Sequence, residues 1–265
     1  DDPFQSLIGW AEDPLVNITV MALIVLGGLG FFVWSDVWDK HSFRRLRLHT
    51  KIVLTATAGL LLFGFGWTLL FEWSNPATLG AFDTPHKLLA AAFESVTLRT
   101  AGFNTIDLGA LTGPSQAVSC LLMFIGGSPG STAGGIKTVT AAVLVLTAIS
   151  AFCGRTTVSA FGRTIAPRSI MNAVTLLMAG GVLCLVGACA IAGIEDAPFH
   201  QCLFEAVSAF GTVGVSMGLT PTLAAASRVI LIVMMYMGRV GVLTLGVAVF
   251  MRRREPPRLK YPDAD

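Results

Sequence analysis

Two short loops carry the residues whose types and spacing could bind an ion. The first consists of Thr100, Ala101, Gly102 and Phe103, and the second, at matched spacing, of Thr212, Val213, Gly214 and Val215. Glycine allows backbone angles that turn successive carbonyl oxygens toward one axis, and rings of such carbonyls can replace the hydration shell of K⁺. The pattern therefore predicts two filter loops with K⁺ bound at Gly102 and Gly214. The alternative is a pair of tight turns that bind no ion.

The elements that must position these loops belong to a sequence repeat. The stretch Phe-Glu-Ser-Val-Thr at 93–97 returns as Phe-Glu-Ala-Val-Ser at 204–208, and Met-Phe-Ile-Gly at 123–126 returns as Met-Tyr-Met-Gly at 235–238. Each unit reads as a span, a half-helix, a glycine loop and a second span. A ring needs about four such loops, and this chain supplies two of them.

A further, partial copy of the repeat stands near the start, where Leu-Gly-Gly-Leu-Gly at 26–30 resembles Met-Gly-Arg-Val-Gly at 237–241. Only the last span of this copy is visible, so we expect the chain to be a fragment that lacks the first half of the pore. The expected organisation is an outer loop with the last span of a truncated repeat at 1–39, complete repeats at 40–154 and 155–251, and a cytoplasmic tail at 252–265.

Composition decides which kind of element carries the repeat. The chain is 54% hydrophobic and 13% charged, whereas soluble domains carry about 25% charged residues. Long apolar runs without alternation favour helices over strands, so the predicted fold class is an all-α membrane protein with span–pore helix–span repeats. The expected spans are 16–37, 52–71, 116–150, 170–191 and 222–251. The shorter segments 85–99 and 198–211 are expected to be half-helices of re-entrant loops.

The charges predict how the chain crosses the membrane. Lys and Arg gather in the segments 40–51, 155–168 and 252–260, whereas the opposite loops carry acids. Basic segments stay on the cytoplasmic side. We therefore expect a multi-pass protein of the plasma (inner) membrane whose C-terminus is cytoplasmic and whose half-helices enter from outside.

The second span of the first complete repeat contains a stretch rich in helix breakers. Its small and helix-breaking residues are Gly126, Gly127, Ser128, Pro129, Gly130, Ser131, Thr132, Gly134 and Gly135. Gly and Pro lower local helix stability, so this stretch is expected to be nonhelical and soft. The matched pairs Leu29-Gly30 and Val240-Gly241 are expected to stay within apolar spans. A packing device would be shared by all copies, so a soft loop in one copy alone favours the interpretation that this stretch moves. Close packing of helices through small residues is the alternative.

Five charged residues near or within apolar segments have candidate roles. Arg239 and Lys137 are expected either to place positive charge in the pore or to pair with a carbonyl or acid, and pairing is favoured for Lys137. Glu94 and Glu205 recur in both half-helices and are expected to brace the filter loops, with ion binding as the alternative. Arg99 adjoins the first loop and is expected to brace it too.

Three stretches resemble the Trk/Ktr/HKT superfamily of potassium transport proteins. Residues 97–107 resemble its third filter, 126–138 its broken helix below the filter, and 238–241 its last span. The variants at Pro129 and at Val240-Gly241 are more similar to the Ktr membrane subunit. The resemblance implies four span–pore–span repeats around one pore, of which this chain matches the last span of the second and all of the third and fourth. It also implies that the glycine-rich stretch is a gate loop, which blocks the pore below the filter and moves to open it.

The resemblance implies potassium ion uptake across the membrane. Na⁺ is the rival permeating ion and a candidate coupling or activating ion, but Ser at a filter glycine accompanies Na⁺ permeation in the superfamily, and Gly102 and Gly214 are both Gly. The implied partners are membrane lipid, a second copy in a homodimer and a cytoplasmic nucleotide-binding regulatory ring; the sequence shows no nucleotide or nucleic-acid site. A non-conducting assembly or regulatory subunit is the competing hypothesis. An enzyme is disfavoured because the histidines have no metal-ligand spacing, namely His41, His49, His86 and His200.

Overall fold

The structure is a computed structural model and describes residues 6–241. It is built mostly from helices, as the composition predicts. The α-helices are α1 (Pro14–Leu29), α2 (Phe31–Lys40), α3 (Leu48–Glu72), α4 (Thr84–Thr97), α5 (Gly113–Phe124), α6 (Thr138–Phe152), α7 (Pro167–Glu195), α8 (Phe199–Gly211) and α9 (Ala225–Val240). Single 3-10 turns lie at Ile8–Trp10, Phe43–Arg45, Leu79–Ala81, Leu108–Ala110 and Thr220–Thr222. The strands β1 (Ser159–Ala160) and β2 (Arg163–Thr164) form a short antiparallel ribbon.

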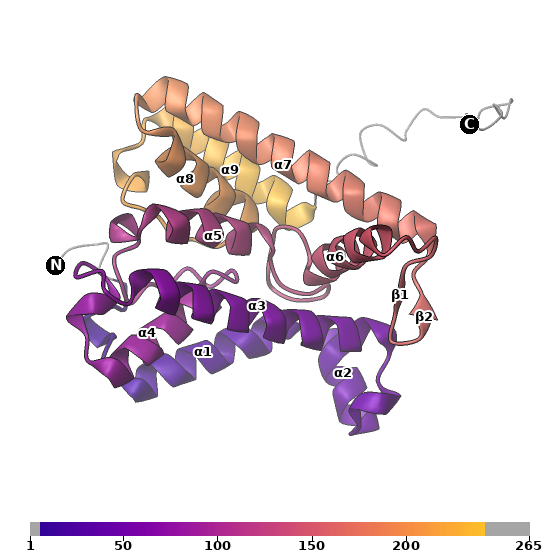
Figure 1. Ribbon diagram of the computed structural model, residues 1–265. Helices are drawn as coiled ribbons and strands as arrows, with labels where there is room; N and C mark the ends of the chain where they lie inside the picture. The colour runs from indigo at the N-terminus through magenta and orange to yellow at the C-terminus, as the bar shows by residue number, and fades with distance from the viewer. Residues whose placement is uncertain (1–5, 242–265) are drawn as a thin grey trace, which may run out of the picture.

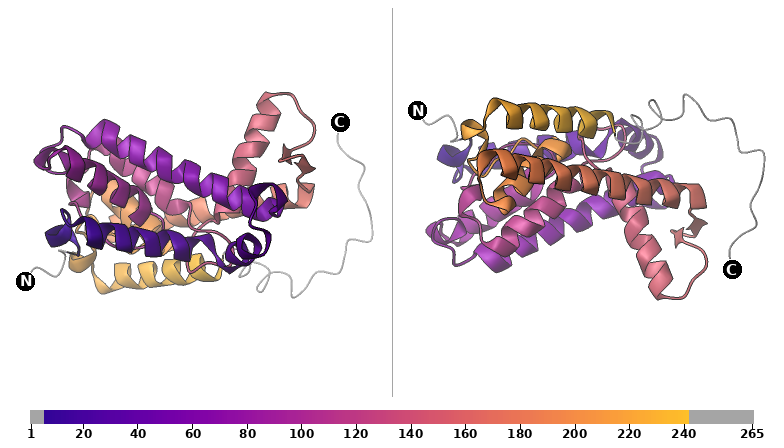
Figure 2. Two further views of the ribbon diagram at one scale, coloured as in Figure 1. Left: turned by 90° about the horizontal axis from the view of Figure 1, so that it is seen from below. Right: turned by 90° about the horizontal axis from the view of Figure 1, so that it is seen from above.

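The two complete repeats appear as two similar groups of helices. In one, the short α4 packs against α3 and α1; in the other, the short α8 packs against α7, α9 and α5. Figure 1 shows α7, α8 and α9 above α5, and α3, α4 and α1 below it. Figure 2 shows that α6 and the β1–β2 ribbon project to one side of the other helices. Helix α5, which belongs to the first complete repeat, therefore forms its contact with the second through α8.

Helix length separates candidate spans from half-helices. Among the described residues, α3 and α7 are long and apolar enough to cross a membrane. By contrast, α4 has 14 residues and α8 has 13, which gives each a length of about 20 Å. A hydrocarbon core is about 30 Å thick. The short helices thus place their C-terminal ends, where the glycine loops begin, inside the protein.

The first expected span, 16–37, is not one straight helix. α1 ends at Leu29, α2 begins at Phe31, and the two helices meet at 90°. Gly30 lies between them with φ +84° and ψ 151°, a combination that is essentially restricted to glycine. The prediction of a continuous span is therefore wrong, because a glycine with these backbone angles ends the helix.

The matched glycine of the last copy also follows a helix end. α9 ends at Val240, and Gly241 has φ +91°. The expected fifth span, 222–251, is seen from Ala225 to Val240; its remainder and the tail 252–265 lie outside the described residues. The premise that only one visible copy breaks its helix is wrong, because all three helices end near this motif. After α1 a single residue, Gly30, separates two helices, whereas the break after α5 is a long nonhelical loop that reaches to Lys137.

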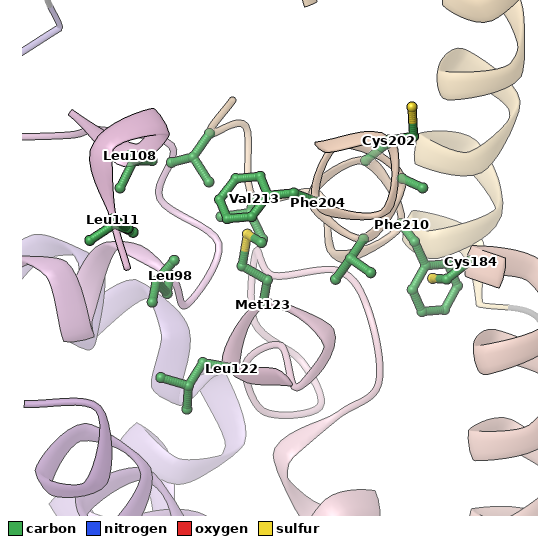
Figure 3. Packing of buried hydrophobic residues seen from close by; sticks show 14 of the residues in the cluster. Leu98, Leu108, Leu111, Leu122, Met123, Cys184, Cys202, Phe204, Phe210 and Val213 are labelled. Atoms are coloured by element: carbon green, nitrogen blue, oxygen red, sulfur yellow. The ribbon is translucent and has the colours of Figure 1, made fainter. Parts of the chain in front are cut away.

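The main hydrophobic core lies where the two repeats meet. Phe93 and Phe204 stand at matched places in the half-helices, and both are fully buried. Figure 3 shows that the cluster gathers Leu98 after α4, Met123 of α5, Phe204 of α8 and Val213 of the second glycine loop. The side chain of a filter residue is therefore part of the core, which fixes the backbone of that loop.

Replacement of Gly30 by Ala is predicted to destabilise the fold. A Cβ there would lie 2.7 Å from Ser128 Oγ and 2.8 Å from the carbonyl oxygen of Pro129. The backbone angles alone cost other residues about 1–3 kcal/mol. Gly28→Ala is the matched control, because a Cβ at this helical position meets nothing within 4 Å. The measurement is the melting temperature of the purified chain in lipid nanodiscs, and equal values for the two variants would contradict the prediction.

Candidate functional site

The two expected filter loops lie against each other. Gly102 has φ +83° and Gly214 has φ +93°, so the prediction of backbone angles that favour glycine is confirmed. A Cβ on Gly102 would lie 2.6 Å from the carbonyl oxygen of Val213 and 3.4 Å from the Cα of Gly214. Two loops far apart in the sequence therefore form one site. That their carbonyls point to a common axis stays a prediction.

Each filter loop is fixed to its half-helix by a hydroxyl that the sequence analysis did not single out. The Thr97 hydroxyl donates to the carbonyl of Phe103, and Ser208 Oγ donates to that of Val215 at 2.6 Å. Both hydroxyl residues are buried. The signal was present, since a hydroxyl residue ends both copies of the Phe-Glu motif. These bonds engage the carbonyl after each filter glycine, so the preceding carbonyls are the better candidates for an ion.

A cavity of about 820 Å³ opens on both loops. Its lining includes filter residues and two carboxylates, among them Gly102, Gly214, Asp107 and Glu205. Carboxylates at the mouth of a pore favour cations. The cavity therefore has the sign of charge that a cation entrance needs.

Glu205 contacts the segment that follows the second filter loop. Its Oε1 accepts hydrogen bonds from the Ser216 hydroxyl and, at 3.1 Å, from Met217 N. Its Oε2 accepts from Thr220 Oγ1 at 2.6 Å. The carboxylate thus holds the chain just beyond the loop, in line with the bracing role expected for it.

Glu94, at the matched position of the other half-helix, differs. It is 1% exposed, and among the described residues neither carboxylate oxygen has a hydrogen-bond partner. The expected bracing contact is therefore not found. The cause is local, because the third repeat has Asn104 and Leu108 where the fourth has the hydroxyl residues Ser216 and Thr220.

The stretch 126–135 is nonhelical, as predicted, and its ends are held together. Ile125 and Ile136 form a short parallel bridge. Gly126 N donates to the carbonyl of Ile136 at 2.8 Å, and Ile136 N donates to that of Phe124 at 3.1 Å. The result is a closed loop between α5 and α6. The paired ends, here called the stem, are residues 124–127 and 136–138.

Two basic residues and one filter residue contact this loop. The Arg239 guanidinium of α9 donates to the carbonyl of Thr132, and Lys137 donates to a carbonyl within the loop. Both contacts correspond to the alternative of pairing with a carbonyl. No room remains for a side chain at Gly134, whose Cβ would collide with the hydroxyl of Thr212. The loop therefore lies directly against the second filter loop.

The opposite side of the loop is bonded to the bend between α1 and α2. Ser128 N donates to the carbonyl of Gly28 at 3.0 Å, and the Ser128 hydroxyl donates to that of Leu29. In return, Phe31 N donates to the carbonyl of Gly130 at 3.2 Å. Helix ends leave such backbone groups without partners inside the helix. The bend and the loop therefore supply hydrogen-bond partners for each other's free backbone groups.

Arg99 was expected to brace the first filter loop, but its side chain reaches the stem. Nη2 donates to the carbonyl of Gly126 at 3.1 Å and to Thr138 Oγ1 at 3.0 Å. In residues 6–241 its guanidinium makes no hydrogen bond to 100–103. The physical reason is that the break between α5 and α6 offers nearby acceptors that a continuous helix would not provide.

Comparison with known proteins decides the family. The family model described as "TrkH: Cation transport protein" matches residues 3–255. The chain belongs to the TrkH family of cation transport proteins. Over 98% of its length it is 38% identical to Ktr system potassium uptake protein B of Bacillus subtilis and 39% identical to potassium/sodium uptake protein NtpJ of Enterococcus hirae. The resemblance inferred from the sequence is thus confirmed.

A solved structure of the TrkH family shares the fold. The potassium transporter TrkH from Vibrio parahaemolyticus superposes with a TM-score of 0.71 at 18% identity, over 90% of this chain and 52% of that chain. The present chain spans 58% of the length of each of the two curated relatives. It therefore shares the family's membrane helical architecture and corresponds to little more than half of each of these proteins.

Replacing Glu205 by Gln is predicted to destabilise the chain more than the same change at Glu94. An amide would present N–H groups where Glu205 accepts hydrogen bonds, and a bond to a charged group is worth about 1.5–3 kcal/mol. At Glu94 the change replaces a buried carboxylate that has no partner among the described residues by an uncharged amide, which costs less to bury, so a neutral or stabilising effect is expected. Melting temperatures in nanodiscs compare the two, and a larger loss at Glu94 would refute the prediction.

Proposed function

We propose that this chain contributes two filter loops to a transporter that takes up K⁺. The observation that carries the proposal is the contact between the loops, in which Gly102 lies against the Val213 carbonyl and Gly214. K⁺ filters use backbone carbonyls as ligands, and glycine is what allows these to come so close. One relative at 38% identity is named a potassium uptake protein. The proposed role is passage of an ion, without catalysis.

Two loops supply only part of the ring that we propose. Known K⁺ filters are built from four loops. The chain spans 58% of the length of its Bacillus subtilis relative, which supports a role as the C-terminal half of a four-repeat pore. This chain leaves part of that relative unmatched. We propose that a segment similar to the unmatched part supplies the other two loops.

K⁺ is the proposed ion and Na⁺ is the second candidate. Both filter loops carry Gly at the third position, and no Ser replaces it at Gly102 or Gly214. The specific reason to keep Na⁺ is that one relative at 39% identity is named a potassium/sodium uptake protein. Na⁺ as a coupling or activating ion belongs to the same second candidate.

We propose that the loop 126–135 is the gate of this pathway. It is placed against the second filter loop at Thr212, it is bonded to α9 through Arg239, and it is bonded to the α1–α2 bend through Ser128. A nonhelical segment with so many glycines has a low cost of rearrangement. In the closed state the loop obstructs the passage on the far side of the filter from the cavity.

The proposed setting is the inner membrane, with the basic segments 40–51 and 155–168 on the cytoplasmic side. We propose a homodimer that contacts lipid and is regulated by a cytoplasmic ring of nucleotide-binding subunits, as the family resemblance implies. In the structure, Lys51 lies 5.8 Å from the ring centroid of Phe43 and 5.9 Å from that of Phe161. This ordered basic and aromatic surface is suited to contact with a partner or with lipid headgroups.

The proposal is tested by joining this chain to the unmatched segment of the Bacillus subtilis relative. In bacterial cells without other K⁺ uptake systems, this chimera is expected to restore K⁺ uptake. Gly102→Ser is expected to lower the ratio of K⁺ to Na⁺ uptake several-fold, because a side chain at that position disturbs the carbonyls that bind the ion. Gly59→Ser is the matched control, since nothing lies within 4 Å of a Cβ at Gly59.

Two results would count against this proposal. A chimera that is present and folded in the membrane yet moves neither ion would favour a non-conducting assembly subunit. Unchanged selectivity for Gly102→Ser, with normal amounts of protein, would remove the first loop from the filter.

Deleting residues 131–134 from the chimera is predicted to raise K⁺ uptake and to reduce its dependence on the regulatory partner. The deletion shortens the proposed gate and removes the contacts of Thr132 and Gly134. Deleting the exposed residues 154–157 is a control of equal length for the amount of folded protein only, because Arg155 lies in a segment proposed to face the partner. Radioactive Rb⁺ uptake measures the effect, and a folded variant with low, partner-dependent uptake would show that the loop serves packing alone.

A further inference from the structure

Arg99 occupies an unusual place for a charged side chain. It lies between the end of α4 and the first filter loop, and it is only 7% exposed. Among the described residues it forms no salt bridge with an acid. A buried cation is costly unless its donors are bonded, and because Nη1 has no partner among the described residues, the groups that accept from Nη2 are significant.

The acceptors of Arg99 lie on both ends of the loop 126–135. Nη2 donates to the carbonyl of Gly126, where the loop begins, and to Thr138 Oγ1, where α6 begins. Thr138 Oγ1 also donates to the carbonyl of Gly126 at 3.0 Å, and Thr138 N donates to that of Gly127 at 3.0 Å. The guanidinium, the hydroxyl and the carbonyl form a closed triangle of hydrogen bonds across the stem.

The other repeat has no such group. Just before the filter threonine, where the third repeat has Arg99, the fourth repeat has Gly211, and there a Cβ would lie 2.5 Å from the carbonyl oxygen of Met123. Helix α8 therefore packs directly on the chain next to the stem, whereas the end of α4 reaches the stem through a side chain. The arginine is present in the repeat that carries the loop.

We infer that Arg99 is a positioning residue that clamps the two ends of the loop 126–135 to each other and to the end of α4. Separation of the stem would break both Nη2 hydrogen bonds and leave a buried cation without partners. The clamp thus favours the closed stem and ties it to the backbone just before the first filter loop.

The test uses the purified chain in lipid nanodiscs and measures amide hydrogen exchange. Arg99→Met keeps a long side chain without donors and is expected to speed exchange at Gly126, Ile136 and Thr138 by about tenfold or more, while α7 is unchanged. Thr138→Val is expected to have a smaller effect of the same kind, and Thr138→Ser is expected to restore slow exchange. Arg228→Met is the control, because this exposed arginine donates to Pro221 instead.

The results separate the clamp from the proposed gate. Unchanged exchange in the stem for Thr138→Val overturns the clamp even if Arg99→Met does not fold. Faster exchange in the stem, rescued by Thr138→Ser, supports it. Any effect of the clamp on gating rests on the proposed function, so the same variants are also measured for Rb⁺ uptake in the chimera. A looser stem with unchanged uptake supports the clamp and contradicts the proposal that the loop is a gate.

Discussion

Backbone N–H and C=O groups that leave a helix inside a membrane must find partners within the protein or in a water-filled cavity, because lipid offers none. This constraint connects the two breaks in the structure. α1 stops at Leu29 and frees its last carbonyls, and the nonhelical loop between α5 and α6 frees amide groups of its own. Ser128 and Gly130 bring these groups together with Gly28, Leu29 and Phe31. Each break stabilises the other, so the loop could leave its position only if the bend found new partners.

The filter loops obey the same rule. α4 and α8 end inside the protein, and the hydroxyls of Thr97 and Ser208 bond the carbonyls that follow each filter glycine. The loops can then approach one another because Gly102 has no Cβ. Val213 contributes its side chain to the core shown in Figure 3, which holds the second loop from behind. The site is therefore a product of two repeats meeting, and neither repeat contains it alone.

The two repeats support their loops by different means. In the fourth repeat the Glu205 carboxylate holds the segment after the filter. In the third repeat Glu94 makes no such contact among the described residues, and Arg99 ties the end of the half-helix to the stem. The stem of the loop 126–135 is thus bonded to the end of the third repeat's half-helix through Arg99. The loop itself lies against the fourth repeat at Thr212. A movement of the loop therefore changes the surroundings of the second filter loop at Thr212 and of Arg99 just before the first.

The sequence by itself determined the helical membrane class, the short helices α4 and α8, the positive-φ glycines at 102 and 214, the nonhelical stretch and the family. These follow from composition, the length of apolar runs and short motifs, which are local properties of the chain. The tertiary structure decided the partners. Gly30 permits a helix to end without requiring it, and Glu94 and Glu205 look alike until the hydroxyls around Glu205 are in place. The acceptors of Arg99 lie 27 and 39 residues along the chain, and no local pattern can specify which freed backbone group a distant side chain will reach.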